Sequence, residues 1–434
     1  MRNSEQLKRN NKMLKFPYAL SDFNALISED YFYVDRTSHI PLIENAGLQL
    51  LFLRPRRFGK TLLLSMLGNY YDVAKADQFE RLFGHLAIGQ NPTPKHNQCF
   101  VMTWDFSNVN PEGDGEAREI WQALYRYVNE RIQAFALYYQ AWLPFEVEIY
   151  PNNAVASFQS LMTAVEFSPH RLYLLVDEYD HFANKLMMGS RENSSNQHDS
   201  LLYYGDALRG LFKAVKSVTC APALERVFIT GVSPLVFSDM RSGYDVAEDI
   251  FDRGEFNDLC GFRESELAQA LSQIAKDSEL PPDKAQQALA TMQNFYKGYC
   301  FSSEVTELVY HPTLAIDFLS YFQTNCQAPP QMLDEQLATE REIIRYISEL
   351  PHGEALIVEA LNEAPPLSLI KFANNRGVQE LLQASFDTMK SLLYYFGALT
   401  LAGETDIGKL VLKIPNLAVR QHYVSLIREL KTSS

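Results

Sequence analysis

The chain has 434 residues, of which 47% are hydrophobic and 21% are charged, and its formal net charge is −14. This length exceeds one ordinary hydrophobic core, so we expect two or three packed units, and the composition excludes an intrinsically disordered chain. The acidic balance argues against a general nucleic-acid coat protein, because phosphate binding rests on Lys and Arg. DNA binding through a local basic patch stays open, although the charge does not support it.

The cysteines are five in number and scattered, with no C-x-x-C pair or Cys/His cluster. They predict neither a zinc site nor a disulfide framework, and they are typical of reduced thiols in a cytoplasmic protein. Residues 1–15 are basic, but no apolar segment follows that could act as a secretory signal, so we expect a flexible tail. No run of eighteen apolar residues occurs, so we expect no membrane span.

Four short apolar runs are continuous instead of alternating, which predicts strands of a buried, mainly parallel sheet. These runs are Gln49–Leu53, Phe100–Phe106, Leu172–Val176 and Val227–Gly231. Helical patterns lie between and after them, at Lys60–Tyr71, Glu116–Tyr139, Ala154–Phe167 and Leu201–Ser217. The alternation predicts a three-layer α/β domain over residues 16–250. The polar segment Lys185–Ser200 is predicted to be a mobile surface loop.

Beyond residue 250 the pattern becomes helical. Amphipathic helices are predicted at Glu264–Lys276 and Asp283–Tyr296, within a helical lid region over residues 251–330 that ends in a Pro-rich linker at 327–330. Residues 331–434 are predicted to be mostly helical with one hairpin, whose arms are Leu399–Ala402 and Lys409–Ile414. Helices followed by a hairpin suggest a winged-helix-like module.

The first predicted strand runs into a loop that ends Gly-Lys-Thr and continues into a helix, which is the layout of a phosphate-binding Walker A loop. Lys60 can reach a β/γ-phosphate, Thr61 can ligate Mg²⁺, and the N–H groups that open the helix face the anion. The alternative is a basic turn before an amphipathic helix. The predicted nucleotide-binding residues are Arg54, Pro55, Arg56, Arg57, Phe58, Gly59, Lys60, Thr61 and Leu62.

The first loop position holds Arg54, where the general motif has glycine. The arginines at positions 54, 56 and 57 either add phosphate ligands or neutralise acidic surroundings.

Two further strands end in polar residues at the edge where ligands of open α/β sheets bind. The run from Leu172 ends in Asp177 and Glu178, a Walker B pair: Asp177 would hold Mg²⁺, and Glu178 would orient or deprotonate the attacking water. The alternative is a strand end with a solvated turn. The run from Val227 ends in Thr230 and Ser233, whose hydroxyls either lie beside the γ-phosphate or cap the turn.

An ordered series of motifs resembles the AAA-ATPase-like proteins of bacteria, relatives of archaeal and signal-transducing P-loop ATPases. The matching segments are 33–37, 53–61, 105–107, 176–180, 229–234, 242–247, 296–299 and 310–312. In that family Arg is common at the position of Arg54. The resemblance suggests that Tyr33–Thr37 packs near the nucleotide; the alternative is a segment that only covers the sheet. Many family members carry a C-terminal nuclease-type domain, which is not evident here.

The sequence therefore predicts an ATP-binding and ATP-hydrolysing protein with Lys60 and Glu178 in catalysis and Thr61 and Asp177 on Mg²⁺. The alternatives are a non-hydrolysing nucleotide-dependent switch and, less favoured, a DNA-binding protein. Self-association through the ATPase domain is a further hypothesis, in which Arg241 or Arg253 acts on a neighbouring subunit's nucleotide.

Overall fold

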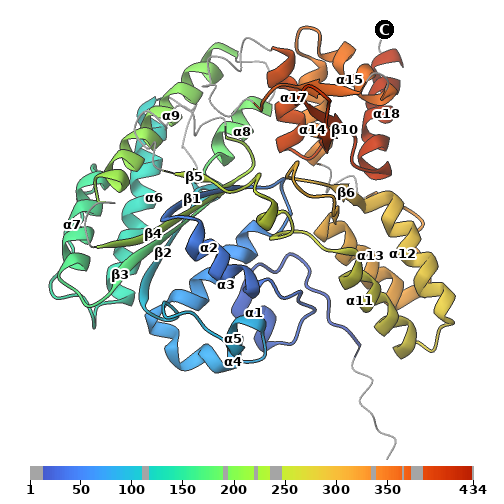
Figure 1. Ribbon diagram of the computed structural model, residues 1–434. Helices are drawn as coiled ribbons and strands as arrows, with labels where there is room; N and C mark the ends of the chain where they lie inside the picture. The colour runs from blue at the N-terminus through green and yellow to red at the C-terminus, as the bar shows by residue number, and fades with distance from the viewer. Residues whose placement is uncertain are drawn as a thin grey trace, which may run out of the picture.

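The computed structural model describes residues 13–109, 117–188, 194–218, 223–234, 247–333, 339–363, 366–372 and 385–432 (Figure 1). Four features of the sequence analysis lie outside the described residues: Cys220, Arg241, the segment 242–246 and the tail up to residue 12. Among the described helices, none is long and apolar enough to cross a membrane.

A five-stranded sheet forms the centre of the N-terminal half. Its strands are β1 (Gln49–Leu53), β2 (Cys99–Asp105), β3 (Arg171–Asp177), β4 (Leu224–Gly231) and β5 (Glu248–Asp249). Their order is β2-β3-β4-β1-β5 and every pairing is parallel. Because parallel strands share one carboxyl edge, the ends of β1, β3 and β4 meet there.

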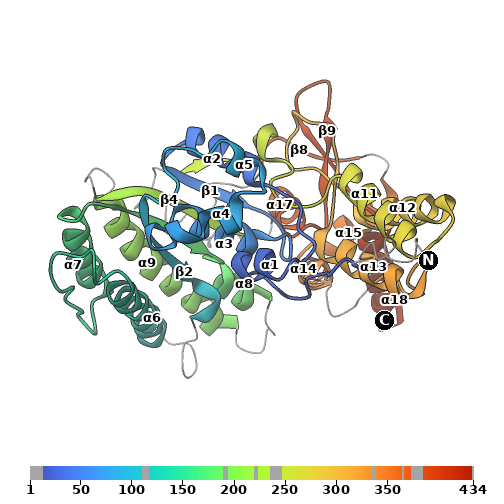
Figure 2. The same ribbon diagram turned by 90° about the horizontal axis from the view of Figure 1, so that it is seen from below.

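Helices cover both faces of this sheet, so the predicted three-layer α/β fold is confirmed (Figure 1). Helix α3 (Lys60–Tyr71) packs on β2 and β3 from one side. Helices α6 (Ala117–Tyr138), α7 (Ala154–Glu166) and α9 (Ser194–Ser217) pack on one another on the opposite side. Short helices surround α3 in Figure 2: α1 (Phe23–Ser28), α2 (Ile40–Ala46), α4 (Phe79–Phe83) and α5 (Ala87–Gln90).

The prediction of a surface loop at Lys185–Ser200 is wrong for most of that segment. Helix α8 spans His181–Met188, and α9 already begins at Ser194. The Ser- and Asn-rich stretch that suggested a loop includes the first residues of α9.

A second, smaller core lies among three helices: α11 (Glu264–Asp277), α12 (Pro282–Tyr296) and α13 (Pro312–Asn325). The first two were predicted and α13 was not. Two short strands, β6 (Lys297–Tyr299) and β7 (Val309–Tyr310), pair antiparallel between α12 and α13. The chain near the N-terminus also packs here, since Leu14 exchanges two backbone hydrogen bonds with the Gln323 side chain.

The C-terminal module combines helices with a three-stranded antiparallel sheet of order β8-β10-β9. Its elements are α14 (Thr339–Ser348), α15 (Gly353–Asn362), β8 (Leu367–Leu369), α17 (Phe386–Tyr395), β9 (Thr400–Glu404), β10 (Leu410–Lys413) and α18 (Leu417–Thr432). The predicted hairpin is present as the antiparallel pair β9–β10, which follows α17. Side chains such as Ile343 and Leu393 belong to the same hydrophobic cluster as the α/β sheet.

Candidate functional site

The loop between β1 and α3 occupies residues 54–59 at the carboxyl edge of the sheet. Gly59 precedes the helix with φ 92°, a left-handed conformation that side chains other than glycine rarely adopt. A Cβ added there would meet no atom within 4 Å, so the requirement for glycine is conformational and not steric. Arg57 is also left-handed, with φ 63°, and its side chain is exposed. This sharp turn leads directly into the helix N-terminus.

Lys60 is buried, and its ammonium lies on the inner side of the loop. Nζ donates to the carbonyls of Arg54 and Pro55, both at 3.1 Å, and lies 3.6 Å from Oε1 of Glu178. The cation is therefore held by three oxygen atoms, at the place where a phosphate-binding loop encloses its anion.

Asp177 is the meeting point of three structural elements. Thr61 at the start of α3 donates from Oγ1 to Asp177 Oδ2 at 2.7 Å, and Thr230 at the end of β4 donates to Oδ1 at 2.6 Å. Burial raises the pKa of the Asp177 carboxyl, and the hydrogen bonds from Thr230 and Thr61 oppose that shift. Asp177 thus contacts two other residues that the sequence predicted for the site, Thr61 and Thr230.

Glu178 follows in a left-handed conformation with φ 50°, which is unusual outside glycine. Its carboxylate lies between Lys60 and His181, whose Nδ1 is 3.6 Å from Oε2. Burial alone would raise the pKa of Glu178, but the cation of Lys60, together with His181 and Arg56, lowers it to about 2. The side chain is therefore an anion at neutral pH.

The turns after β3 and β4 are fixed to each other by Asp180. This buried carboxylate accepts from the N–H groups of Ser233 at 2.7 Å and Val232 at 3.1 Å. A Cβ at Gly231 would lie 2.5 Å from the ring of Tyr179, so only glycine allows this close approach. The Ser233 hydroxyl also points to Asp180, at 3.3 Å. Of the two hydroxyls predicted near phosphate, Thr230 lies at Asp177 and Ser233 caps the turn.

Arg54 does not face the open side of the loop. Its guanidinium donates to the carbonyls of Leu53 and Phe251, both at 2.8 Å, and of Phe256 at 2.7 Å. It also lies over the rings of Phe52 and Phe301. The expectation that Arg54 adds positive charge at the phosphates therefore disagrees with this geometry, in which the side chain anchors the loop to the protein interior.

The rest of the loop also contacts the C-terminal half. The Phe58 ring meets Tyr299 and His311 edge-on, each at 5.0 Å between centroids. Thr313, in the first turn of α13, donates to the carbonyl of Arg57 at 3.0 Å. Arg56 lies 3.6 Å from Glu342 of α14. Loop residues 54–58 are thus held by segments more than 190 positions away.

Other predicted residues lie outside this cluster. In the segment Tyr33–Thr37, Arg36 pairs with Glu266 at 2.6 Å and donates to the carbonyls of Asp258 and Gly261. Residues 33–37 therefore lie next to the start of α11, and Arg36 holds them there. Arg253 pairs with Glu248 on β5 at 2.8 Å.

Residue types alone did not single out His181. A histidine three residues after a strand-end glutamate is the only signal for it, since that spacing places both side chains on one turn if a helix starts there. Within the described residues there is no group of three or more His, Cys, Asp or Glu side chains that could hold a metal ion. Thr61 and Asp177 still suit Mg²⁺, which needs few protein ligands and keeps several waters.

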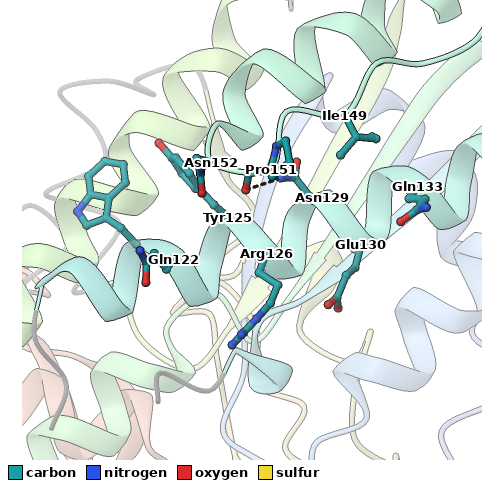
Figure 3. A pocket seen from close by; sticks show the side chains of 10 residues that line it. Gln122, Tyr125, Arg126, Asn129, Glu130, Gln133, Ile149, Pro151 and Asn152 are labelled. Atoms are coloured by element: carbon teal, nitrogen blue, oxygen red, sulfur yellow. Dashed lines mark hydrogen bonds between the residues drawn. The ribbon is translucent and has the colours of Figure 1, made fainter. Parts of the chain in front are cut away.

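An open groove of about 790 Å³ lies elsewhere, along α6 and the segment 149–152 (Figure 3). Trp121, Tyr125, Ile149 and Pro151 line it together with polar side chains. Asn129, which also lines the groove, donates to the carbonyls of Tyr150 and Pro151. The groove contains none of the residues predicted for the site.

Comparisons with known proteins agree with these motifs. Residues 17–241, just over half of the chain, match a family described as predicted AAA-ATPase. A relative from Azotobacter chroococcum mcd 1, described as an uncharacterized protein in the vnfD 5′ region, is 23% identical over 361 residues. The alignment covers 79% of this chain and 60% of that relative, so the chain spans less than two thirds of the relative's length.

A similar solved structure is the Orc1 protein of Aeropyrum pernix in complex with DNA. It is 11% identical, and the superposition covers 92% of this chain and 96% of that one. The TM-score of 0.33 is too low for any structural or functional argument.

Proposed function

The chain belongs to the predicted AAA-ATPase family, and on this premise we propose that it binds ATP with Mg²⁺ at the 54–62 loop and hydrolyses the nucleotide. One observation carries the proposal: the 2.7 Å hydrogen bond from Thr61 to Asp177. It joins the helix start that would receive the phosphates to the strand end that carries the acidic pair. These are the two parts that P-loop ATPases bring together around Mg²⁺.

In this proposal Lys60 and the N–H groups at the start of α3 hold the β- and γ-phosphates. Lys60 exchanges its contacts with the Arg54 and Pro55 carbonyls for phosphate oxygens, which requires no large movement because its ammonium already lies inside the loop. Thr61 and Asp177 would hold Mg²⁺, which neutralises the charge that develops on the transferred phosphoryl group. Thr230 keeps one Asp177 oxygen fixed.

Glu178 is the residue we assign to the attacking water. Its pKa of about 2 keeps it ionised, so it can accept a hydrogen bond from that water and orient it. Most of the rate acceleration would come from positioning and from charge stabilisation by residues that are already in place.

We further propose that residues 251–330 act as a lid that responds to the nucleotide. The contacts of Phe58 with Tyr299 and His311, and of Thr313 with the Arg57 carbonyl, couple the loop to this region.

Self-association, with Arg253 acting on a neighbouring subunit, belongs to the same proposal. A cytoplasmic location is proposed from the cysteines, since Cys99, Cys260 and Cys300 are buried free thiols.

The test measures Mg²⁺-dependent phosphate release by the full chain and by Glu178→Gln, with Mg-ATP binding by calorimetry for both and for Lys60→Ala. We expect turnover by the parent, at least about 100-fold less by Glu178→Gln, and loss of binding in Lys60→Ala. Tight binding without phosphate release by the parent would instead indicate the nucleotide-dependent switch. An unchanged isotherm for Lys60→Ala would overturn nucleotide binding at this loop.

DNA binding by the winged-helix-like module is not favoured by the packing of α17. Its residues Thr388, Met389, Ser391, Leu392, Leu393, Tyr394 and Tyr395 are buried. Tyr395 contacts Phe251, and the Tyr394 hydroxyl donates to the carbonyl of Phe301. Duplex recognition through a helix requires an exposed, cation-rich face, and α17 instead packs against Phe251 and Phe301 of the region 251–330.

A further inference from the structure

The Glu178 carboxylate has a second basic neighbour besides Lys60. His181 lies with its Nδ1 3.6 Å from Oε2, while the Lys60 ammonium is 3.6 Å from Oε1. The two neighbours therefore face different oxygens of one carboxylate. Both acidic and imidazole side chains are partly exposed, at 20% for Glu178 and 32% for His181.

These two neighbours are not equivalent when a nucleotide is bound. Lys60 would turn its ammonium to phosphate, and its hold on Glu178 would weaken. His181 belongs to the same turn as Glu178, because its N–H donates to the Glu178 carbonyl at 2.9 Å. This backbone contact involves no atom of the loop 54–59.

The backbone of His181 is fixed independently of its ring. It is the first residue of α8, and Asn184 in that helix donates to Asp180 at 2.8 Å. The next residue, Phe182, packs against Tyr204 with 5.0 Å between centroids. Replacing the imidazole therefore leaves the supports of the helix start intact.

We propose that His181 is a positioning residue for Glu178, an inference that rests on the proposed hydrolysis. Its Nδ1–H donates to Oε2, and this contact aims Oε1 at the attacking water after Lys60 has moved to the phosphates. Hydrogen bonds of this kind are often long in the free enzyme and shorten in the complex with substrate.

The first experiment compares steady-state ATP hydrolysis by His181→Ala, His181→Asn and the control Lys185→Ala, which changes an exposed residue of the same helix. We expect His181→Ala to lower kcat about 10- to 100-fold with KM changed less than about twofold, because misplacing a catalytic group costs rate and not binding. His181→Asn should recover part of the rate, since its amide can donate. Lys185→Ala should match the parent.

A double variant separates positioning from a general structural role. In a Glu178→Gln background, His181→Ala should cause no further loss, because the residue acts only through the Glu178 carboxylate. An additive loss in that background, or a raised KM with kcat unchanged, would overturn the proposal.

A spectroscopic readout decides the pairing even for a protein that does not turn over ATP. In long-range ¹H–¹⁵N spectra at alkaline pH, with His181→Gln providing the assignment, the parent should show the Nδ1–H tautomer, and Glu178→Ala should lose it. Absence of turnover in the parent would defeat the proposed hydrolysis alone. An Nε2–H tautomer in both proteins would defeat the His181 contact.

Discussion

The guanidinium carbon of Arg54 lies 3.9 Å from the centroid of the Phe301 ring, so the first residue of the loop between β1 and α3 packs against the chain that follows α12. The same guanidinium donates to the carbonyls of Phe251 and Phe256. Burial lowers the pKa of Arg54 to about 10, which still leaves it a cation at neutral pH. The buried guanidinium, which is held by three carbonyl oxygens, fixes the base of the loop to the segment 251–256.

Arg54→Lys should destabilise the protein although it keeps the charge. Lysine has a single donor group and cannot reach the three carbonyls as a planar guanidinium does, so buried acceptors are left unpaired. We expect the free energy of unfolding to fall by about 2–4 kcal/mol in urea denaturation.

Arg57→Lys is the matched control for this change, because Arg57 lies in the same loop with an exposed side chain. Its free energy of unfolding should stay within about 0.5 kcal/mol of the parent. Equal destabilisation by the two variants would contradict the anchoring role of Arg54.

Thr230→Val should weaken the link between β4 and the Asp177 carboxylate. The valine has the shape of threonine but cannot donate the 2.6 Å hydrogen bond to the buried Asp177 carboxyl. We expect the free energy of unfolding at pH 7 to fall by about 1.5–3 kcal/mol. Thr230→Ser keeps the hydroxyl and should lose only about 0.5–1.5 kcal/mol, for one buried methyl. A larger loss in the serine variant would assign the effect to packing instead.

The acid sensitivity of the protein should depend on His311, which packs against Phe58. Burial, aided by the nearby Arg57, lowers the pKa of His311 from 6.5 to about 3. Between those values the unfolded chain binds a proton that the folded protein excludes, so stability is lost as pH falls from 6.5 towards 3. The loss attributable to this residue is about 1.6 kcal/mol between pH 6.5 and pH 5.

His311→Asn removes the titrating group and keeps a side-chain acceptor for the N–H of Leu314, which His311 Nδ1 accepts at 3.4 Å. Urea denaturation at both pH values should therefore show a smaller loss for the variant than for the parent. The same pH dependence in both proteins would show that His311 is not buried in its neutral form.

Most of the α/β fold could be predicted from the sequence, because continuous apolar strands and a Gly-Lys-Thr helix start are local patterns. The bounds of β1 and α3 agree with those predicted. Strand β4 begins at Leu224, before the predicted start at Val227. The prediction missed this first part because it contains a charged residue, Arg226, which is buried in the structure. Its guanidinium donates to the carbonyls of Ile43 and Glu44, both at 2.8 Å. From sequence alone, a charged residue indicates the end of a buried strand, because the distant carbonyls that accept its hydrogen bonds are not known.

The same reason limits what could be predicted of the site. The types and spacing of Lys60, Thr61 and Asp177 pointed to residues that the structure brings together. The direction of Arg54 depends on carbonyls about 200 positions away, which no local pattern contains. His181 was missed because the start of α8 falls next to a segment whose polar composition resembled a loop.

Arg56 should contribute to nucleotide affinity independently of its partner Glu342. The two side chains are 3.6 Å apart and exposed to 21% and 61%, and an ion pair of this exposure contributes little to stability. Arg56 is therefore free to exchange this carboxylate for a phosphate oxygen, and a guanidinium–phosphate contact is among the stronger hydrogen bonds. We expect Arg56→Gln to weaken Mg-ATP binding about tenfold by calorimetry, equivalent to about 1.4 kcal/mol.

Glu342→Gln should change the affinity less than about twofold and the free energy of unfolding by under about 1 kcal/mol. If the two variants weakened binding equally, the ion pair itself would be the feature that supports the loop, and Arg56 would not be a phosphate ligand.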